Sequence, residues 1–287
     1  ETAMIAYLKR GILEGWLFIK DLKAGTVQPM LVDSVKYHPA SGRGDSRTPA
    51  HTQLSLVYWS KGEMRHRSFS WQLDELRGGR RVSQLLSEEG LVKETKELIR
   101  LYEEGEKRFL EWRVQLGEQF IATGEFDAGG WREHDSELHG TRIVVDDRCD
   151  DIENRRATQI FYEFDDEDDE SEATEIEKTD KEYTRVPIEP WIWCFNLDSH
   201  RGGWVHIDSM KPYVYRPELR EKLILPTEHS DLIDALTGDM DILMEDIITG
   251  KSGGTTIICQ GRSGTGKTLT AEVYSEIIKR PLYRVHS

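Results

Sequence analysis

The stretch Gly261-Arg262-Ser263-Gly264-Thr265-Gly266-Lys267-Thr268 has the Walker A spacing of a phosphate-binding loop: glycine, four residues, glycine, lysine, then serine or threonine. Glycines let the backbone adopt conformations that a side chain would block, so that amide groups turn inward around phosphate oxygens. Lys267 supplies a cation for the β- and γ-phosphates, and Thr268 supplies a hydroxyl ligand for Mg²⁺. We therefore expect this loop, together with the adjacent Leu269, to bind ATP with Mg²⁺.

The residues on either side of the loop strengthen this prediction. The β-branched run Thr255-Thr256-Ile257-Ile258-Cys259 comes directly before it and predicts a strand. Leu269, Val273 and Ile277 follow at helical spacing and predict a helix that starts at the loop. Strand, glycine loop and helix form the setting that a phosphate-binding loop requires, whereas a glycine-rich turn without a ligand needs neither flank.

Three segments resemble the AAA branch of the AAA+ ATPases. The first is Gly264–Thr268 followed by Leu269-Thr270-Ala271-Glu272, the second is Arg280-Pro281-Leu282-Tyr283-Arg284-Val285, and the third is Asp246-Ile247-Ile248-Thr249-Gly250-Lys251. The resemblance is to a group with a large N-terminal domain before a single ATPase module. Most AAA proteins have two prolines where this chain has Arg262 and Ser263, so the stiffening of the loop by proline is lost.

The resemblance implies a hexameric ring that couples ATP hydrolysis to the remodelling of a protein or a macromolecular assembly. Lys267 would stabilise charge on the transferring phosphoryl group, and Thr268 would hold the metal. The acidic Walker B strand, the sensor residues and the arginine finger would follow Ser287. We expect the sequence to be the N-terminal part of a longer protein and to be inactive as an ATPase by itself.

Two other functions are compatible with the same loop. A nucleotide-regulated binding or scaffold module would bind ATP tightly and hydrolyse it slowly or not at all. A P-loop small-molecule kinase would also use the loop, but such kinases usually carry it near the N-terminus, and here 260 residues come first.

The sequence predicts two domains. Residues 1–215 are expected to form an α+β domain that recognises a partner, and residues 216–287 to form the start of an α/β P-loop module, truncated after its first helix. In the first domain, 53–59 and 64–71 predict a hairpin around Ser60-Lys61-Gly62-Glu63. Further strands are expected at 30–35, 141–145, 158–164, 186–197 and 203–207.

Three helices are expected besides the one after the loop. Leu91, Leu98 and Tyr102 share a helical face, with Ser87 as N-cap and Gly105 as the end. A second helix is expected from Glu106 to Phe120, and a third from Thr227. In the strand at 186–197, alternating Trp191, Trp193, Phe195 and Leu197 indicate a half-buried face rather than a ligand platform.

The net charge of -15 is concentrated in one segment. Residues 163–182 contain twelve acids and two lysines, a local charge of -10, and leave -5 for the rest. With almost no apolar residue, 164–183 is expected to be a disordered acidic loop. The basic residues Arg65, His66, Arg67, Arg77, Arg80 and Arg81 are too few to favour nucleic-acid binding.

The amino-acid composition narrows the classes of protein to which the chain can belong. Apolar residues make up 37% and charged residues 32%, a balance typical of globular proteins. No apolar run reaches the roughly 18 residues of a membrane helix, and no secretion signal is present, so we expect a cytoplasmic protein. Cys149, Cys194 and Cys259 are far apart, which disfavours both a disulfide framework and a zinc site.

Overall fold

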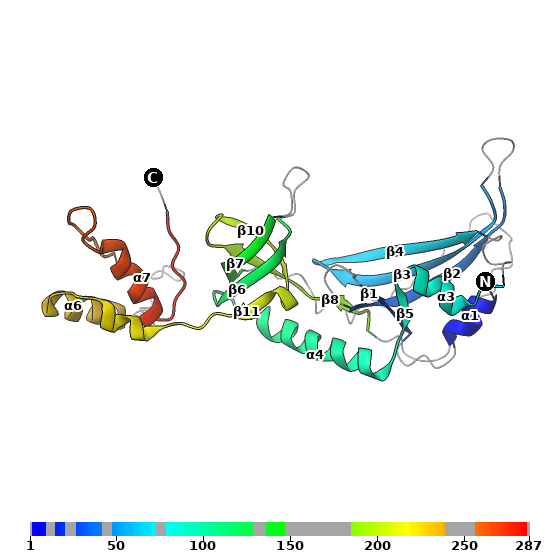
Figure 1. The fold of residues 1–287 in the computed structure, drawn as a ribbon, viewed down its shortest axis with the longest axis horizontal. Helices are drawn as coiled ribbons and strands as arrows, with labels where there is room; N and C mark the ends of the chain where they lie inside the picture. Colours follow the sequence, from blue (N-terminus) through cyan, green and yellow to red (C-terminus); the bar gives the residue numbers. More distant parts are fainter. Residues whose placement is uncertain are drawn as a thin grey trace, which may run out of the picture. The chain divides into compact units, whose positions relative to one another are not determined.

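The computed structural model describes residues 2–9, 15–20, 27–41, 48–72, 79–128, 136–146, 185–238 and 256–285 (Figure 1). The chain divides into two compact units. Unit 1 consists of Glu1–Val114, Asp147–Trp193 and His206–Asp208, and unit 2 of Gln115–Asp146, Cys194–Val205 and Ser209–Ser287. These units do not coincide with the ranges 1–215 and 216–287 expected from the sequence.

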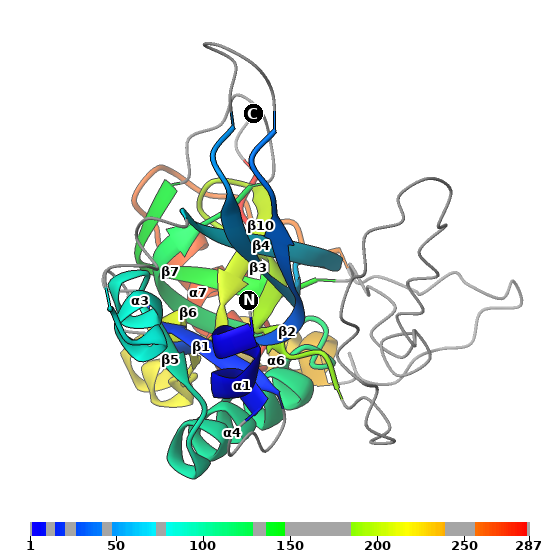
Figure 2. The same ribbon diagram turned by 90° about the vertical axis from the view of Figure 1, so that its right-hand side faces the viewer.

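Unit 1 is built on a six-stranded, mostly antiparallel sheet with the order β4-β3-β2-β1-β5, in which the short β8 pairs with β3 in parallel. The long strands β2, β3 and β4 can be followed in Figure 2. The expected hairpin is confirmed as β3 and β4, joined at Lys61 and Gly62, whose φ angles are 51° and 81°. The bounds are β1 Trp16–Lys20, β2 Val27–His38, β3 His51–Ser60, β4 Glu63–Gln72, β5 Leu91–Lys93 and β8 Ile188–Glu189.

Helices pack on both faces of this sheet. Helices α1 (Thr2–Lys9) and α3 (Val82–Glu88) contribute Met4, Leu8, Leu85 and Leu86 to a core with Leu54 and Leu56 of β3. Tyr102 of α4 (Lys96–Trp112) belongs to a second core with Trp16, Phe18, Leu31 and Val57. Leu56 and Val57 are neighbours on β3 and therefore point to opposite faces, so the two cores lie on opposite sides of the sheet.

The helix boundaries expected around α4 are wrong. Ser87 lies inside α3, Leu91 lies in β5, and the N-cap of α4 is Thr95, whose side chain accepts the Leu98 amide at 3.2 Å. Gly105 does not end the helix, because the buried face of Tyr102, Glu106 and Phe109 continues past it. Packing on that face outweighs the roughly 1 kcal/mol that glycine costs inside a helix. The helix expected over 106–120 is the second half of α4 and ends at Trp112.

A polar network attaches the segment before β8 to α4. The Tyr102 hydroxyl accepts the amide of Ile188 at 2.7 Å and lies 3.4 Å from a Glu106 carboxylate oxygen. Arg185 donates to the same carboxylate, which is buried, through its Nε at 3.3 Å. The network therefore satisfies a buried charge and fixes where the chain rejoins unit 1.

The second sheet is antiparallel, with the order β10-β9-β7-β6-β11. Beyond β6, Asp127 bridges Trp204 of β10 through two backbone hydrogen bonds of 3.1 and 2.8 Å, which closes the sheet into a small barrel. A Cβ on Gly203 would lie 2.6 Å from the Phe126 ring, so only glycine fits at this closure. The bounds are β6 Gln119–Phe126, β7 Ser136–Val145, β9 Trp191–Asn196, β10 Arg201–His206, the 3₁₀ turn η2 Ile207–Ser209, and β11 Met210–Pro212.

Strand β9 is half-buried, as expected, and its aromatic side is the less buried one. Ile192, Cys194 and Asn196 are buried, whereas Trp191, Trp193 and Phe195 are intermediate. The strands expected at 30–35 and 141–145 are confirmed as parts of β2 and β7. The strand expected at 203–207 is confirmed over 203–206 as part of β10, whereas Ile207 begins η2. The strand expected at 158–164 and the acidic segment 164–183 lie outside the described residues.

After β11 the chain forms the 3₁₀ helix η3 (Pro217–Lys222) and helices α6 (Thr227–Gly238) and α7 (Lys267–Ile277). The described residues thus combine helices with mostly antiparallel sheets, which agrees with the α+β class expected for the N-terminal domain. The α/β module expected at 216–287 is not shown, because the described part of that range contains helices and no strand. No described helix has both the length and the apolarity needed to cross a membrane.

His206 is the described histidine whose charge state the fold most clearly changes. Its side chain is 18% exposed, and burial lowers its pKa below 6.5, although Asp208, whose carboxylate lies 3.7 Å away, opposes this. The Nδ1 atom accepts the Asp208 amide at 3.3 Å, which requires an unprotonated nitrogen and agrees with the lowered pKa. The ring is therefore neutral in the folded protein near neutral pH.

We predict that His206 makes stability fall on acidification. Because the folded pKa lies below the unfolded value of 6.5, the unfolded chain takes up the proton first, and stability is lost as pH falls from 6.5 toward the folded pKa. Thermal melts of wild type and His206→Asn between about pH 8 and about pH 5 measure this. The variant keeps an acceptor for the Asp208 amide and should lose less stability on acidification; equal losses would contradict the prediction.

Candidate functional site

The glycine loop forms an exposed turn that leads directly into α7. Gly264 and Gly266 have φ angles of 79° and 86°, a region that favours glycine, and a Cβ on Gly261 would meet the Thr265 Oγ1 atom at 2.9 Å. Two glycines of the motif, Gly264 and Gly266, are therefore favoured by the conformation of the loop, whereas a side chain at Gly261 would require only that Thr265 change its rotamer. The helix begins at Lys267, as the sequence predicts.

Backbone amide groups at this turn are available for a ligand. Hydrogen bonds among the described residues do not use the amides of Gly264, Gly266, Lys267 or Thr268. The last two belong to the first turn of α7, where amides have no partner inside the helix and carry partial positive charge. An anion with several oxygens, such as a phosphate chain, matches this set of donors.

The Lys267 side chain folds back onto the loop backbone. Its Nζ atom donates to the carbonyl oxygens of Gly261 at 3.0 Å and Arg262 at 2.7 Å. Both contacts are exposed, so phosphate oxygens can replace these carbonyls as partners of the ammonium group. The amine is therefore held at the loop backbone, where an incoming anion would compete with two carbonyl oxygens for it.

The loop offers one side-chain ligand for a metal ion, the hydroxyl of Thr268. The Thr268 side chain is exposed in the first turn of α7, and its hydroxyl can join phosphate oxygens and water around Mg²⁺, which prefers oxygen ligands. Among the described residues no group of three or more His, Cys, Asp or Glu could hold a metal ion. A single hydroxyl is one ligand, so a metal at this place would need its other oxygen ligands from a bound anion and water.

The strand expected before the loop is not formed. Residues 256–260 have no regular secondary structure, and Ile257 and Ile258 are 42% and 89% exposed. Their β-branched side chains favour a strand, but the described residues offer no neighbouring strand to pair with. Of the predicted apolar face of α7, Val273 is buried, whereas Leu269, next to the loop, is 49% exposed.

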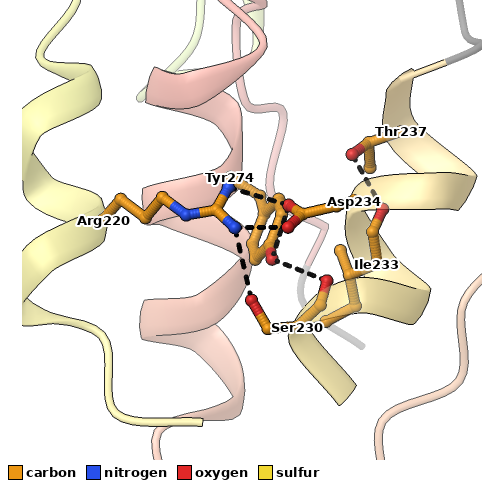
Figure 3. A network of polar contacts seen from close by, with 6 residues as sticks. All are labelled: Arg220, Ser230, Ile233, Asp234, Thr237 and Tyr274. Atoms are coloured by element: carbon orange, nitrogen blue, oxygen red, sulfur yellow. Dashed lines mark hydrogen bonds and ion pairs between the residues drawn. The ribbon is translucent and has the colours of Figure 1, made fainter. Parts of the chain in front are cut away.

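A polar network fixes one side of α7 to α6 and η3 (Figure 3). Arg220 of η3 donates through both terminal nitrogens to the Asp234 carboxylate of α6, and one of them also contacts the Ser230 hydroxyl. The Tyr274 hydroxyl of α7 donates to Asp234 at 3.1 Å. The hydrogen bond from Arg220 lowers the pKa of Asp234, so the carboxylate stays charged at neutral pH.

Glu276 fixes the other side of α7, near its C-terminal end. Its side chain is 6% exposed; one oxygen accepts the Tyr213 hydroxyl at 2.6 Å and the other accepts the Arg216 amide at 2.9 Å. The Arg142 guanidinium of β7 lies 3.9 Å from the carboxylate and 5.3 Å from the Tyr213 ring. Burial and then the bond to Glu276 raise the pKa of Tyr213, which therefore stays a neutral donor.

The segment after α7 also contacts the barrel. The Tyr283 ring packs against Phe195 of β9 and against His200, with centroid distances of 5.6 and 4.8 Å. Arg284 forms an ion pair with Glu272 of α7. Tyr283 therefore covers part of the outer aromatic side of β9, and the loop helix and the barrel belong to one compact unit.

Sequence reasoning located the loop and missed its support. The sequence does not distinguish Tyr274 and Glu276 from ordinary surface residues of a helix, because their partners lie far away along the chain. Tyr213, Arg216 and Arg142 lie at least 60 residues away. The clustering of Tyr213 and Tyr215 just after β11 was the one local signal.

Comparison with protein-family models, curated proteins and solved structures gives no match.

We predict that Glu276→Ala loosens α7 from its supports. The substitution leaves the Tyr213 hydroxyl and the Arg216 amide without a buried acceptor, which should lower the free energy of opening of α7 by about 2 kcal/mol, and about half as much in Glu276→Gln. Hydrogen exchange of the α7 amides measures this. Glu272→Gln on the same helix is the control and should change exchange little; an unchanged rate in Glu276→Ala would exclude the supporting role.

Proposed function

We propose that the chain binds ATP with Mg²⁺ at Gly261–Thr268, with Leu269 beside the nucleotide. The observation that carries the proposal is the combination at one turn of two left-handed glycines, available amides and the Lys267 ammonium group. Each component alone is common in proteins. Together, at the start of a helix and with Walker A spacing, they match the triphosphate in charge and geometry.

The chemical roles follow from where each group lies. The loop amides would bind the phosphate oxygens, and Lys267 would exchange its two carbonyl partners for the β- and γ-phosphates. Thr268 would place the metal between those phosphates. Arg262 and Ser263 are exposed, so their side chains face solvent rather than the loop interior.

We further propose that this site belongs to an AAA+ ATPase that works as a ring, with hydrolysis driving the remodelling of a protein or an assembly. The support is the resemblance of the segments around the loop. That resemblance assigns water activation to an acidic residue and charge neutralisation to a neighbouring subunit's arginine, and neither is matched to a residue of this sequence. Lys267 is the catalytic residue that this chain would supply.

The attachment of α7 suits such a function. A change at the loop acts on the N-terminal end of α7, while Glu276 near the other end contacts the segment that leaves the barrel. A helix transmits displacement along its axis because its backbone hydrogen bonds are continuous. Nucleotide state would therefore reach the barrel through α7.

We predict that Lys267→Ala weakens binding of ATP with Mg²⁺ by about ten- to a hundredfold, because it removes a charge-assisted hydrogen bond to phosphate. Titration of the 287-residue chain with a fluorescent ATP analogue measures binding without requiring turnover. Lys222→Ala, an exposed lysine of η3, is the matched control and should bind as wild type. Wild-type affinity in Lys267→Ala would refute the site.

A further inference from the structure

The basic tripeptide Arg65-His66-Arg67 lies on the edge strand of unit 1. β4 is the last strand in the order β4-β3-β2-β1-β5 and pairs with β3 along all ten of its residues. Among the described residues nothing pairs with its other side. The side chains of 65–68 are all exposed, as are Glu63, Ser70 and Gln72. A long exposed edge of this kind offers a row of backbone donors and acceptors to another extended chain.

Strand pairing assigns these side chains to faces. Arg65 and Arg67 lie opposite Tyr58 and Leu56, so both arginines are on the face that continues into the core containing Phe69. His66, Ser68 and Ser70 lie on the other face, opposite Val57, Ser55 and Gln53. The arginines are two residues apart and therefore about 7 Å apart along the edge, which is also the spacing of alternate residues on a neighbouring strand.

The contacts that the arginines make with other described residues are weak. The one carboxylate on β4, Glu63, lies 3.2 Å from Arg65, and both side chains are about half exposed or more, at 48% and 69%. Arg67 lies over the Phe69 ring at 5.4 Å, which keeps it along the strand. Exposed contacts of this kind contribute little and are readily exchanged for a better-placed carboxylate.

We propose that the edge of β4 is a docking site for an extended acidic segment of a partner protein, which adds to the sheet as a further strand. Backbone hydrogen bonds along 64–72 would provide affinity, and carboxylates two residues apart, next to Arg65 and Arg67, would provide specificity. The partner's intervening residues would face His66, Ser68 and Ser70 and are polar. A polypeptide is favoured over a nucleic acid because only another polypeptide backbone complements the edge. The site is independent of the nucleotide loop.

The test uses the complete 287-residue chain and a labelled peptide of about twelve residues that alternates glutamate with threonine. Fluorescence anisotropy at low salt should show binding about tenfold tighter than that of the same peptide with glutamine for glutamate. Arg65→Glu combined with Arg67→Glu should abolish this preference. Hydrogen exchange followed by NMR should show protection at alternate amides of β4, those directed away from β3.

Arg100→Glu combined with Lys107→Glu on α4 reverses the same number of charges at exposed positions and should keep wild-type binding. Thermal melts establish that both double variants are folded. The proposal is overturned if the peptides bind equally, if reversal at β4 has no effect, or if protection appears elsewhere. It is also overturned if single-stranded DNA of equal length competes as well as the acidic peptide, or if light scattering shows that a second copy occupies the edge.

Discussion

A buried carboxylate on the loop helix determines how this region is organised. Glu276 has lost most contact with water, and an unpaired charge in that position would cost several kcal/mol. Its two oxygens are satisfied by a tyrosine hydroxyl and a backbone amide from the segment that follows β11, with an arginine of β7 nearby. The position of α7, and with it that of the glycine loop, is therefore determined by residues far away in sequence.

The two ends of α7 have different environments. At the N-terminal end Gly261 and Gly264 are exposed, and the described hydrogen bonds of the Lys267 amine go to two backbone carbonyl oxygens. Nine residues later, about 14 Å along the helix, Glu276 is fixed. Between them, Tyr274 joins α7 to Asp234 and Arg220 (Figure 3). A helix that is open at one end and fixed at the other can transmit an event at the loop to the residues that hold it.

Sequence patterns predicted the structural features that depend on residues close to one another in the sequence. The β3–β4 hairpin and the start of α7 at Lys267 follow from alternation, turn residues and glycine spacing. Features that depend on distant residues could not be predicted. Gly105 continues a helix because its neighbours are buried, and Thr256–Cys259 form no strand because a strand needs a partner as well as a propensity. Alternation in β9 likewise did not show that Ile192 and Cys194, rather than the aromatic residues, are the buried set.

The route of the chain has a consequence for how such a protein can be altered. Strands β6 and β7 precede the segment that returns to unit 1 at β8, and β9, β10 and β11 follow it. Neither unit is a continuous stretch of sequence. A single deletion that spans all strands of the barrel would therefore also remove β8 and the segment bound to Tyr102, which belong to the other unit.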